Sequence, residues 1–236
     1  MAEATLTIAS RNYGSWSLRG WLLCKMAGLD FAEQQTASDD PSIRAELLLL
    51  SPSFLVPCLT HDGIKVWDTL AIAEYLNELK PKCKLMPDDR AARARCRAIS
   101  GEMHSGFSNL RSALPMNLKA HYPGFKVWAG AQADIDRVTA IWRESLAASG
   151  GPYLFGKEPC MADAMYAPVV TRFLTYGARP IARRSWRCRT CRNGSRAPGP
   201  SRTNWKSSTW NSERKAAKQF SEPAGLSQPG TARLTP

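Results

Sequence analysis

The alternation of strand and helix patterns over the first 80 residues restricts the fold more than any other feature of this chain. Residues 5–10 alternate apolar with polar side chains, as a half-buried strand does, and residues 16–27 then carry apolar side chains at helical spacing. The following segments predict a strand at 31–35, a helix at 41–50, a hairpin over 56–67 and a helix at 68–80. This βαβαββα order predicts a small α/β domain with parallel pairing in one half of its sheet and antiparallel pairing in the other.

Beyond a polar linker at 81–89 the sequence shows only helical patterns. They predict helices over 90–114, 131–148 and 162–176. In the first of these, apolar side chains recur at helical spacing at Ile99, Met103, Phe107 and Leu110. The chain is therefore expected to contain an α/β domain at 1–81 and an all-α domain at 90–178.

Charge separates a third segment from these two. The whole chain has a net charge of +12, from 32 Lys and Arg against 20 Asp and Glu, but nearly all of the excess lies in 179–236. That segment shows neither the helical nor the strand periodicity and is rich in Arg, Ser, Pro, Gly and Thr. This composition predicts a basic tail of low order. Its charge alone would allow nucleic-acid binding. Its Cys188 and Cys191 lack the second ligand pair of a closed zinc site, so no metal site is expected.

Segment lengths and cysteine usage indicate the compartment. No run approaches the roughly 20 apolar residues of a membrane span, and residues 1–4 do not begin a signal peptide, so we expect a cytoplasmic protein without a membrane segment. The seven cysteines are odd in number and mostly lie in apolar periodic segments. That usage is typical of buried thiols in a reducing compartment.

Three short segments carry a specific resemblance. They are NYGSWSLR at 12–19, VPCL at 56–59 and WDTLAIAEYL at 67–76. In this order and spacing they resemble the glutathione S-transferase family, in its bacterial, serine-type cytosolic class, over residues 5 to about 177. The resemblance implies a thioredoxin-like domain that binds glutathione, followed by an all-α domain that offers a pocket for an electrophile.

Ser15 is the expected catalytic residue. At a strand-to-helix turn, its hydroxyl and the first helical N–H groups favour an anion. A hydrogen bond to a charged group contributes about 1.5–3 kcal/mol and a helix N-terminus about 0.3–1, enough to lower a thiol pKa by about one to two units. Relatives usually carry two adjacent serines, and Gly14 takes the first place here. Ser17 is therefore kept as the reserve, with Tyr13 or a water third, and the alternative is that these serines only cap the helix.

The resemblance assigns the other two segments to the glutathione peptide. Val56-Pro57 fits the family's cis-proline, whose neighbouring main-chain groups would pair with the peptide as a short added strand. A trans proline that starts an edge strand is the alternative. Asp68 would take the γ-glutamyl ammonium and Thr69 the carboxylate, although both are also ordinary N-cap residues.

Two features of the helical domain extend the comparison. Met103, Phe107 and Arg111, with His104 beside them, form a stripe that either lines the second-substrate pocket or belongs to the core. Cys160 stands where relatives have a capping Ser or Thr. A thiol accepts hydrogen bonds poorly, so we predict a lost cap that costs about 1 kcal/mol.

The sequence thus predicts a glutathione transferase-like enzyme, with glutathione as co-substrate, that conjugates the glutathione thiolate to an electrophilic small molecule. Relatives imply a homodimer. The alternatives are a glutathione-dependent isomerase and a non-catalytic glutathione-binding protein, with nucleic-acid binding through the tail as a remote one. The tail also has the look of the family's acidic terminal segment read in a shifted frame, which would leave the last helices of the fold missing.

Overall fold

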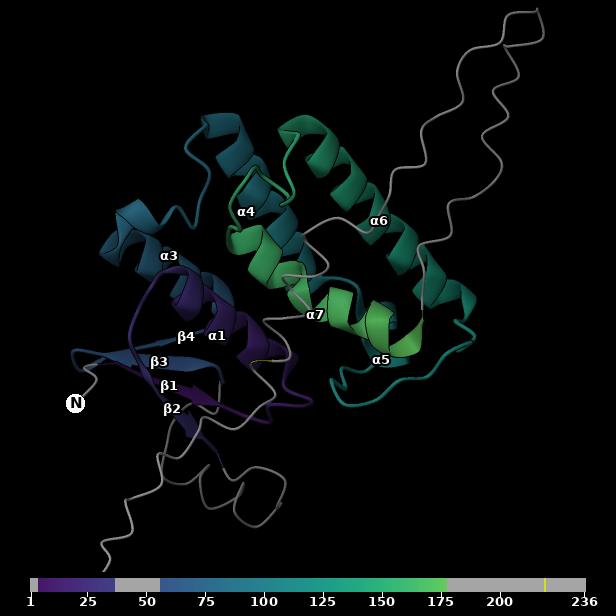
Figure 1. Cartoon of the computed structure of the whole chain (residues 1–236), viewed down its shortest axis with the longest axis horizontal. Helices are drawn as coiled ribbons and strands as arrows, with labels where there is room; N and C mark the ends of the chain where they lie inside the picture. The colour runs from purple at the N-terminus through teal and green to yellow at the C-terminus, as the bar shows by residue number, and fades with distance from the viewer. Residues whose placement is uncertain (1–3, 37–55, 178–218, 220–236) are drawn as a thin grey trace, which may run out of the picture.

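The structure of this chain is a computed structural model, which describes residues 4–36, 56–177 and 219 (Figure 1). The predicted helix at 41–50 lies outside the described residues. So does the tail at 179–236, apart from Gln219.

Four strands form a mixed sheet in the order β2-β1-β3-β4. They are β1 (Ala4–Ile8), β2 (Ala32–Gln35), β3 (Cys58–His61) and β4 (Ile64–Trp67). Strand β1 pairs in parallel with β2 and antiparallel with β3, and β3 and β4 form the hairpin. Asp62 and Gly63 turn that hairpin with φ angles of 49° and 77°. The predicted pairing pattern and hairpin are confirmed.

Two helices cover one face of this sheet, namely α1 (Ser15–Met26) and α3 (Thr69–Leu79) (Figure 1). Alternate residues of β1 are buried, and Leu6 and Ile8 belong to the same apolar cluster as side chains of both helices. Helix α1 also packs against α7 (Met161–Tyr176) of the helical domain. It is therefore buried on more than one face, which explains why residues 17 to 24 are all buried.

The linker at 81–89, which the sequence predicted to be polar, buries two apolar side chains. It begins with the short 3-10 helix η1 (Pro81–Cys83). Leu85 and Met86 then turn inward and are buried, at 0% and 4% exposure. The linker thus contributes to the common core.

The helical domain contains α4 (Arg90–Ser105), α5 (Ser108–Ala113), α6 (Ala129–Ser149) and α7. The prediction of one helix over 90–114 is wrong, because the helix is interrupted at Gly106, and Phe107 takes a left-handed conformation with φ of 59°. Since α5 has no side-chain cap of its own, Asp134 of α6 accepts the hydrogen bond from the Leu110 N–H at 2.9 Å. The apolar spacing continues across the break and conceals it in the sequence.

The start of α7 also differs from the prediction. Cys160 and Asp163 form a complete capping box: the Cys160 sulfur faces the Asp163 N–H, and Asp163 Oδ2 accepts from the Cys160 N–H at 2.9 Å. Asp163 Oδ1 also accepts from the Leu154 N–H at 3.0 Å. The predicted loss of the capping arrangement at Cys160 is therefore wrong, since the sulfur occupies the place of the hydroxyl in the box, while the predicted cost in stability stays a prediction.

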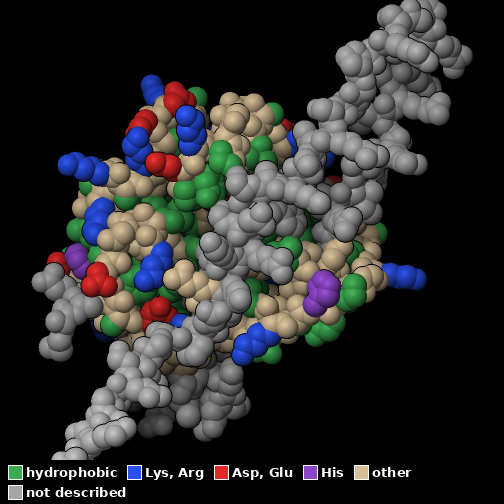
Figure 2. Space-filling model, in the orientation of Figure 1, with side chains coloured by type: hydrophobic (Ala, Val, Ile, Leu, Met, Phe, Trp, Pro, Cys, Tyr) green, Lys and Arg blue, Asp and Glu red, His purple; other side chains and the backbone are tan. Residues whose placement is uncertain are grey.

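On the face that Figure 2 shows, charged side chains of both signs are mixed among the described residues. Several pair across elements, such as Arg97 with Glu74 and Arg137 with Glu102. No described helix combines the length and the hydropathy that a bilayer crossing requires.

Candidate functional site

A tight loop leads from β1 into α1 and presents Ser15. The Ser10 hydroxyl accepts hydrogen bonds from the N–H groups of Asn12 and Tyr13, and the Gly14 N–H donates to the Ser10 carbonyl oxygen at 2.9 Å. A Cβ on residue 14 would lie 2.4 Å from that oxygen. The loop therefore has no room for the serine that the resemblance expects at this position.

The two candidate serines have different surroundings. Ser17 is 1% exposed, and its hydroxyl accepts a hydrogen bond from the Ala9 N–H at 2.9 Å. Ser15 is half-buried at the first turn of α1, and no described residue hydrogen-bonds with its hydroxyl. Neither side chain caps the helix, since α1 starts at Gly14 without a side-chain cap. Ser15 is thus the serine with a hydroxyl available to a ligand.

Val56 and Pro57 lie against α1. Their peptide bond is cis, as the resemblance implies. A Cβ on Gly20 would lie 2.6 Å from Pro57 Cβ, so the absence of a side chain at residue 20 permits this contact. No described residue hydrogen-bonds with the main chain of Val56. Within the described residues, the N–H and C=O of Val56 therefore have no main-chain partner.

Asp68 and Thr69 begin α3 in distinct ways. Asp68 has a φ of 75°, and its Oδ1 accepts from the N–H groups of Leu70 (2.8 Å) and Ala71 (3.4 Å). This carboxylate therefore does cap the helix. Thr69 is 1% exposed, and its hydroxyl oxygen has no hydrogen-bond partner among the described residues.

His104 of α4 joins the starts of α1 and α3. Its Nε2 contacts Asp68 Oδ2, the carboxylate oxygen that does not cap α3. Its ring centroid lies 5.0 Å from that of Trp16, the residue after Ser15. The guanidinium of Arg111 lies 5.1 Å from the same Trp16 ring. Of the predicted stripe, His104 and Arg111 therefore reach the site.

The other two members of that stripe belong to the core. Met103 and Phe107 are 0% and 8% exposed. The break after α4 separates Phe107 from the helix that carries Met103.

A cluster of arginines lies behind Trp16. Arg19 stacks on the Trp16 ring at 4.4 Å and donates to the carbonyl oxygens of Met165 and Ser15. Arg172 of α7 donates from Nε to the Leu114 carbonyl oxygen at 2.8 Å. Within the described residues no carboxylate pairs with Arg19, Arg111 or Arg172, and the Nη2 of Arg19 is buried without a partner.

Burial and repulsion between charges depress the pKa values of Arg19 and Arg172. Burial holds the pKa of Arg19 well below its usual range, and the charges of Arg172 and Arg111 lower it further. Burial also lowers the pKa of Arg172 to about 10, with the charge of Arg111 as a second cause. The cluster places positive charge beside the N-terminus of α1, which favours an anion there.

Asn12 fixes the loop before Ser15 to the helical domain. Its Nδ2 donates to Asn117 Oδ1 at 2.9 Å, and its carbonyl oxygen accepts from the Leu118 N–H. Sequence reasoning missed this contact, because 105 residues separate the two asparagines and neither lies in a periodic segment. Arg19 was missed as well, since one arginine in an amphipathic helix is normally exposed.

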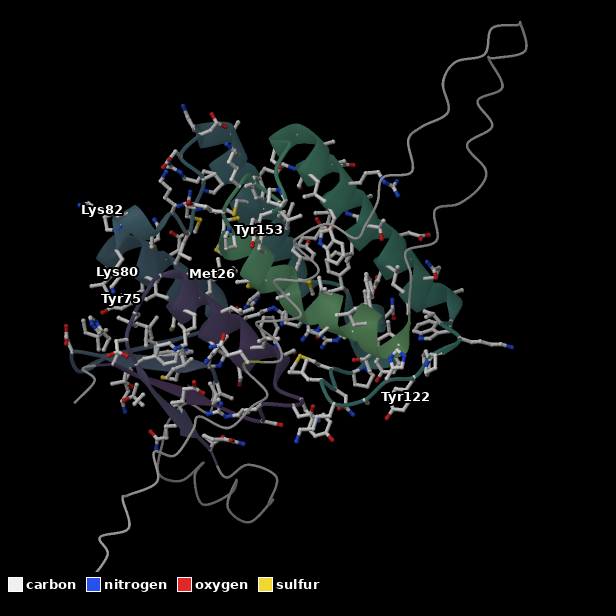
Figure 3. The ribbon with its side chains drawn as sticks, in the orientation of Figure 1. Met26, Tyr75, Lys80, Lys82, Tyr122 and Tyr153 are labelled. Carbon is white, nitrogen blue, oxygen red and sulfur yellow. The ribbon has the colours of Figure 1, made fainter. Side chains whose placement is uncertain are left out.

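The described residues contain other features that lie apart from Ser15. A cavity of about 260 Å³ lies between the C-terminal half of α1 and the start of α7, and Met26 and Tyr153 line it (Figure 3). Within 4–36 and 56–177, no three His, Cys, Asp or Glu side chains gather as a metal site. Cys188 and Cys191 lie outside the described residues.

Comparison with known proteins gives a consistent result. The sequence model described as the glutathione S-transferase N-terminal domain matches residues 13–79. A rat (Rattus norvegicus) protein named maleylacetoacetate isomerase is 32% identical over 161 residues, which cover 68% of this chain and 73% of that protein.

Solved structures share the fold. The crystal structure of a maleylacetoacetate isomerase from Anaeromyxobacter dehalogenans has a TM-score of 0.56 at 20% identity, and the match covers 99% of this chain and 98% of that one. A Burkholderia glutathione transferase homologue with bound glutathione has a TM-score of 0.51 at 22% identity. That match covers 72% of this chain and 80% of the homologue.

Proposed function

This chain belongs to the glutathione S-transferase family, and on that premise we propose that it binds glutathione above the N-terminus of α1 and transfers its thiolate to an electrophilic carbon of a small molecule. Glutathione is the co-substrate. Residues 1–81 form the glutathione-binding domain and residues 90–178 the helical domain.

The hydroxyl of Ser15 carries this proposal. Unlike the hydroxyl of Ser17, it forms no hydrogen bond with a described residue. It also lies beside an arginine cluster that no described carboxylate neutralises. Ser15 donates a hydrogen bond to the glutathione sulfur and stabilises its charged form. In this proposal Ser15 is a neutral donor and does not act as a base.

The rest of glutathione lies along the residues that precede β3 and α3. The main chain of Val56 pairs with the peptide backbone as an added strand. The free hydroxyl of Thr69 donates to the γ-glutamyl carboxylate, and Asp68 accepts from the ammonium. His104 is a positioning residue, because it holds the carboxylate oxygen of Asp68 that does not cap α3.

The electrophile lies against the helical domain, next to the ring of Trp16. His104 and Arg111 both lie against that ring, and Trp16 directly follows Ser15 in the chain.

A glutathione-dependent isomerase is the second candidate function. Two observations favour it: Arg19, Arg111 and Arg172 have no described carboxylate partner, which suits an anionic substrate, and the rat relative is named maleylacetoacetate isomerase. In this reaction the thiolate adds to a double bond and leaves again after rotation, so glutathione is not consumed. A non-catalytic glutathione-binding protein remains the alternative outside the enzymes.

We also propose a cytoplasmic homodimer, as the resemblance implies. The edge strand β4 exposes Ile64 (53%) and Trp67 (45%), which offers apolar surface to a second protomer. Nucleic-acid binding through the basic tail stays the remote alternative.

Retention on immobilised glutathione, followed by conjugation with a chlorodinitrobenzene, tests the proposal. The full chain should be retained and eluted by free glutathione, and it should form the thioether. Ser15→Ala should be retained but conjugate slowly. Retention without conjugation by either protein would support the binding protein, and no retention at all would refute the proposal.

A further inference from the structure

Cys96 and Cys160 form a pair of thiols inside the helical domain. Cys96 lies in α4 and Cys160 precedes α7, and their sulfurs are 3.8 Å apart although 64 residues separate them in the chain. They are 0% and 3% exposed. The proposed transfer reaction uses neither of them.

The hydrogen bond between the two sulfurs shifts their pKa values in opposite directions. The hydrogen bond from Cys160 lowers the pKa of Cys96, and the Ala162 N–H and the Ser100 hydroxyl act in the same direction. The same hydrogen bond, together with burial, raises the pKa of Cys160. Cys96 is therefore the thiol of the pair that loses its proton more readily. By contrast, burial raises the pKa of Cys24, an equally buried cysteine, to about 12.

A cavity of about 400 Å³ at the surface reaches Cys160, the outer member of this pair. Cys160 lines it together with Ala92, Phe155 and Lys157. Because only 3% of Cys160 is exposed, a bulky disulfide reagent cannot reach the sulfur. A molecule close to the size of water can enter as far as Cys160, and a local opening at this residue must admit it to Cys96, which is 0% exposed.

We propose that Cys96 and Cys160 are a modification site, a dithiol that hydrogen peroxide converts into a disulfide linking α4 to the start of α7. The Cys96 thiolate attacks one peroxide oxygen, the O–O bond breaks, and Cys96 becomes a sulfenic acid while hydroxide leaves. Cys160 sulfur then attacks the Cys96 sulfur and displaces its hydroxide. The two thiol protons convert both hydroxides to water. Two electrons pass from the sulfurs to the peroxide.

The geometry permits the second step with a small movement. A disulfide bond is about 2.05 Å long, so the sulfurs must approach by somewhat less than 2 Å. Cys160 is the N-cap residue of α7, outside the regular turns of that helix. Its movement toward Cys96 would disturb the capping contacts with Asp163 and not the hydrogen bonds of the regular turns.

Mass spectrometry of the folded full chain tests this inference. The background protein carries Cys188→Ser and Cys191→Ser, so that the tail cysteines do not react. After peroxide treatment and alkylation of free thiols, digestion should give a Cys96–Cys160 cross-linked peptide lighter by about 2 Da than the two thiol peptides, and a dithiol reductant should reverse it.

Cys24 is the internal control, since it is equally buried but has no described thiol partner. It should stay alkylatable after denaturation. In Cys160→Ser the reaction should stop at a Cys96 sulfenic acid, which dimedone traps. If the cross-linked peptide is absent, or forms no faster than Cys24 is oxidised, the inference is wrong. This result does not depend on glutathione binding or transfer.

Discussion

Replacing Ser17 and Ser15 separately by alanine should divide stability from chemistry. Ser17 is 1% exposed and its hydroxyl accepts from the Ala9 N–H at 2.9 Å. Ser17→Ala leaves that buried N–H without its acceptor, a loss of about 1–3 kcal/mol in the free energy of unfolding. For a protein of this size, that lowers the unfolding midpoint by roughly 2–12 °C.

Ser15→Ala should have the opposite profile. No described residue hydrogen-bonds with the Ser15 hydroxyl, so its removal should change the free energy of unfolding by no more than about 0.5 kcal/mol. The transition state would lose a hydrogen bond to a charged sulfur, worth about 1.5–3 kcal/mol, which corresponds to a fall in kcat/KM of roughly 10- to 150-fold.

Thermal unfolding and conjugation kinetics, measured on both variants and the parent protein, check this pair. The pH profile of kcat/KM should also move to higher pH in Ser15→Ala, because a thiolate without its donor has a higher pKa. A stable Ser17→Ala without activity, beside an active Ser15→Ala, would refute the assignment and transfer the role to Ser17.

Three further outcomes are expected. Thr69→Val removes a buried hydroxyl that has no described partner, so the unfolding midpoint should stay equal or rise while the Kd for glutathione rises about 10-fold or more; an unchanged Kd would contradict the role of Thr69. His104→Phe keeps a ring against Trp16 but releases Asp68, so KM for glutathione should rise more than kcat falls. His104→Gln should recover part of the lost glutathione binding. Equal effects of the two variants would argue against a positioning role for His104. Cys24 keeps its proton in the folded protein up to about pH 12, whereas the unfolded chain loses it near 9.0. The free energy of unfolding therefore falls as pH rises between these values. Cys24→Ala should flatten this pH dependence in denaturant titrations, and an unchanged dependence would contradict the prediction.

The sheet and its hairpin could be predicted because their signals are local. Alternation in β1 and the Asp62-Gly63 turn involve neighbouring residues. The break between α4 and α5 could not, because Asp134 supplies the missing cap from another helix. The capping of α7 by Cys160 was misjudged for a similar reason, since the isolated preference of a thiol ignores how closely a buried sulfur is held.

The candidate site was predicted in part. The sequence motifs supplied Ser15, Val56-Pro57 and Asp68-Thr69, whose functional roles remain predictions. The buried state of Ser17 and the arginine cluster depend on contacts between distant segments, such as Arg19 with Met165 across 146 residues. Periodicity indicates which face of a helix is apolar, but it does not show which polar groups lie together.

The burial of α1 has a consequence for how the protein unfolds. This helix lies between the sheet and α7, and a single cluster of buried side chains runs through both domains. Separating the domains would expose apolar side chains of α1 such as Trp21 and Leu22 to water. The two domains should therefore lose their structure in one cooperative transition, and a ligand bound at the start of α1 should protect the helical domain as strongly as the domain that holds it.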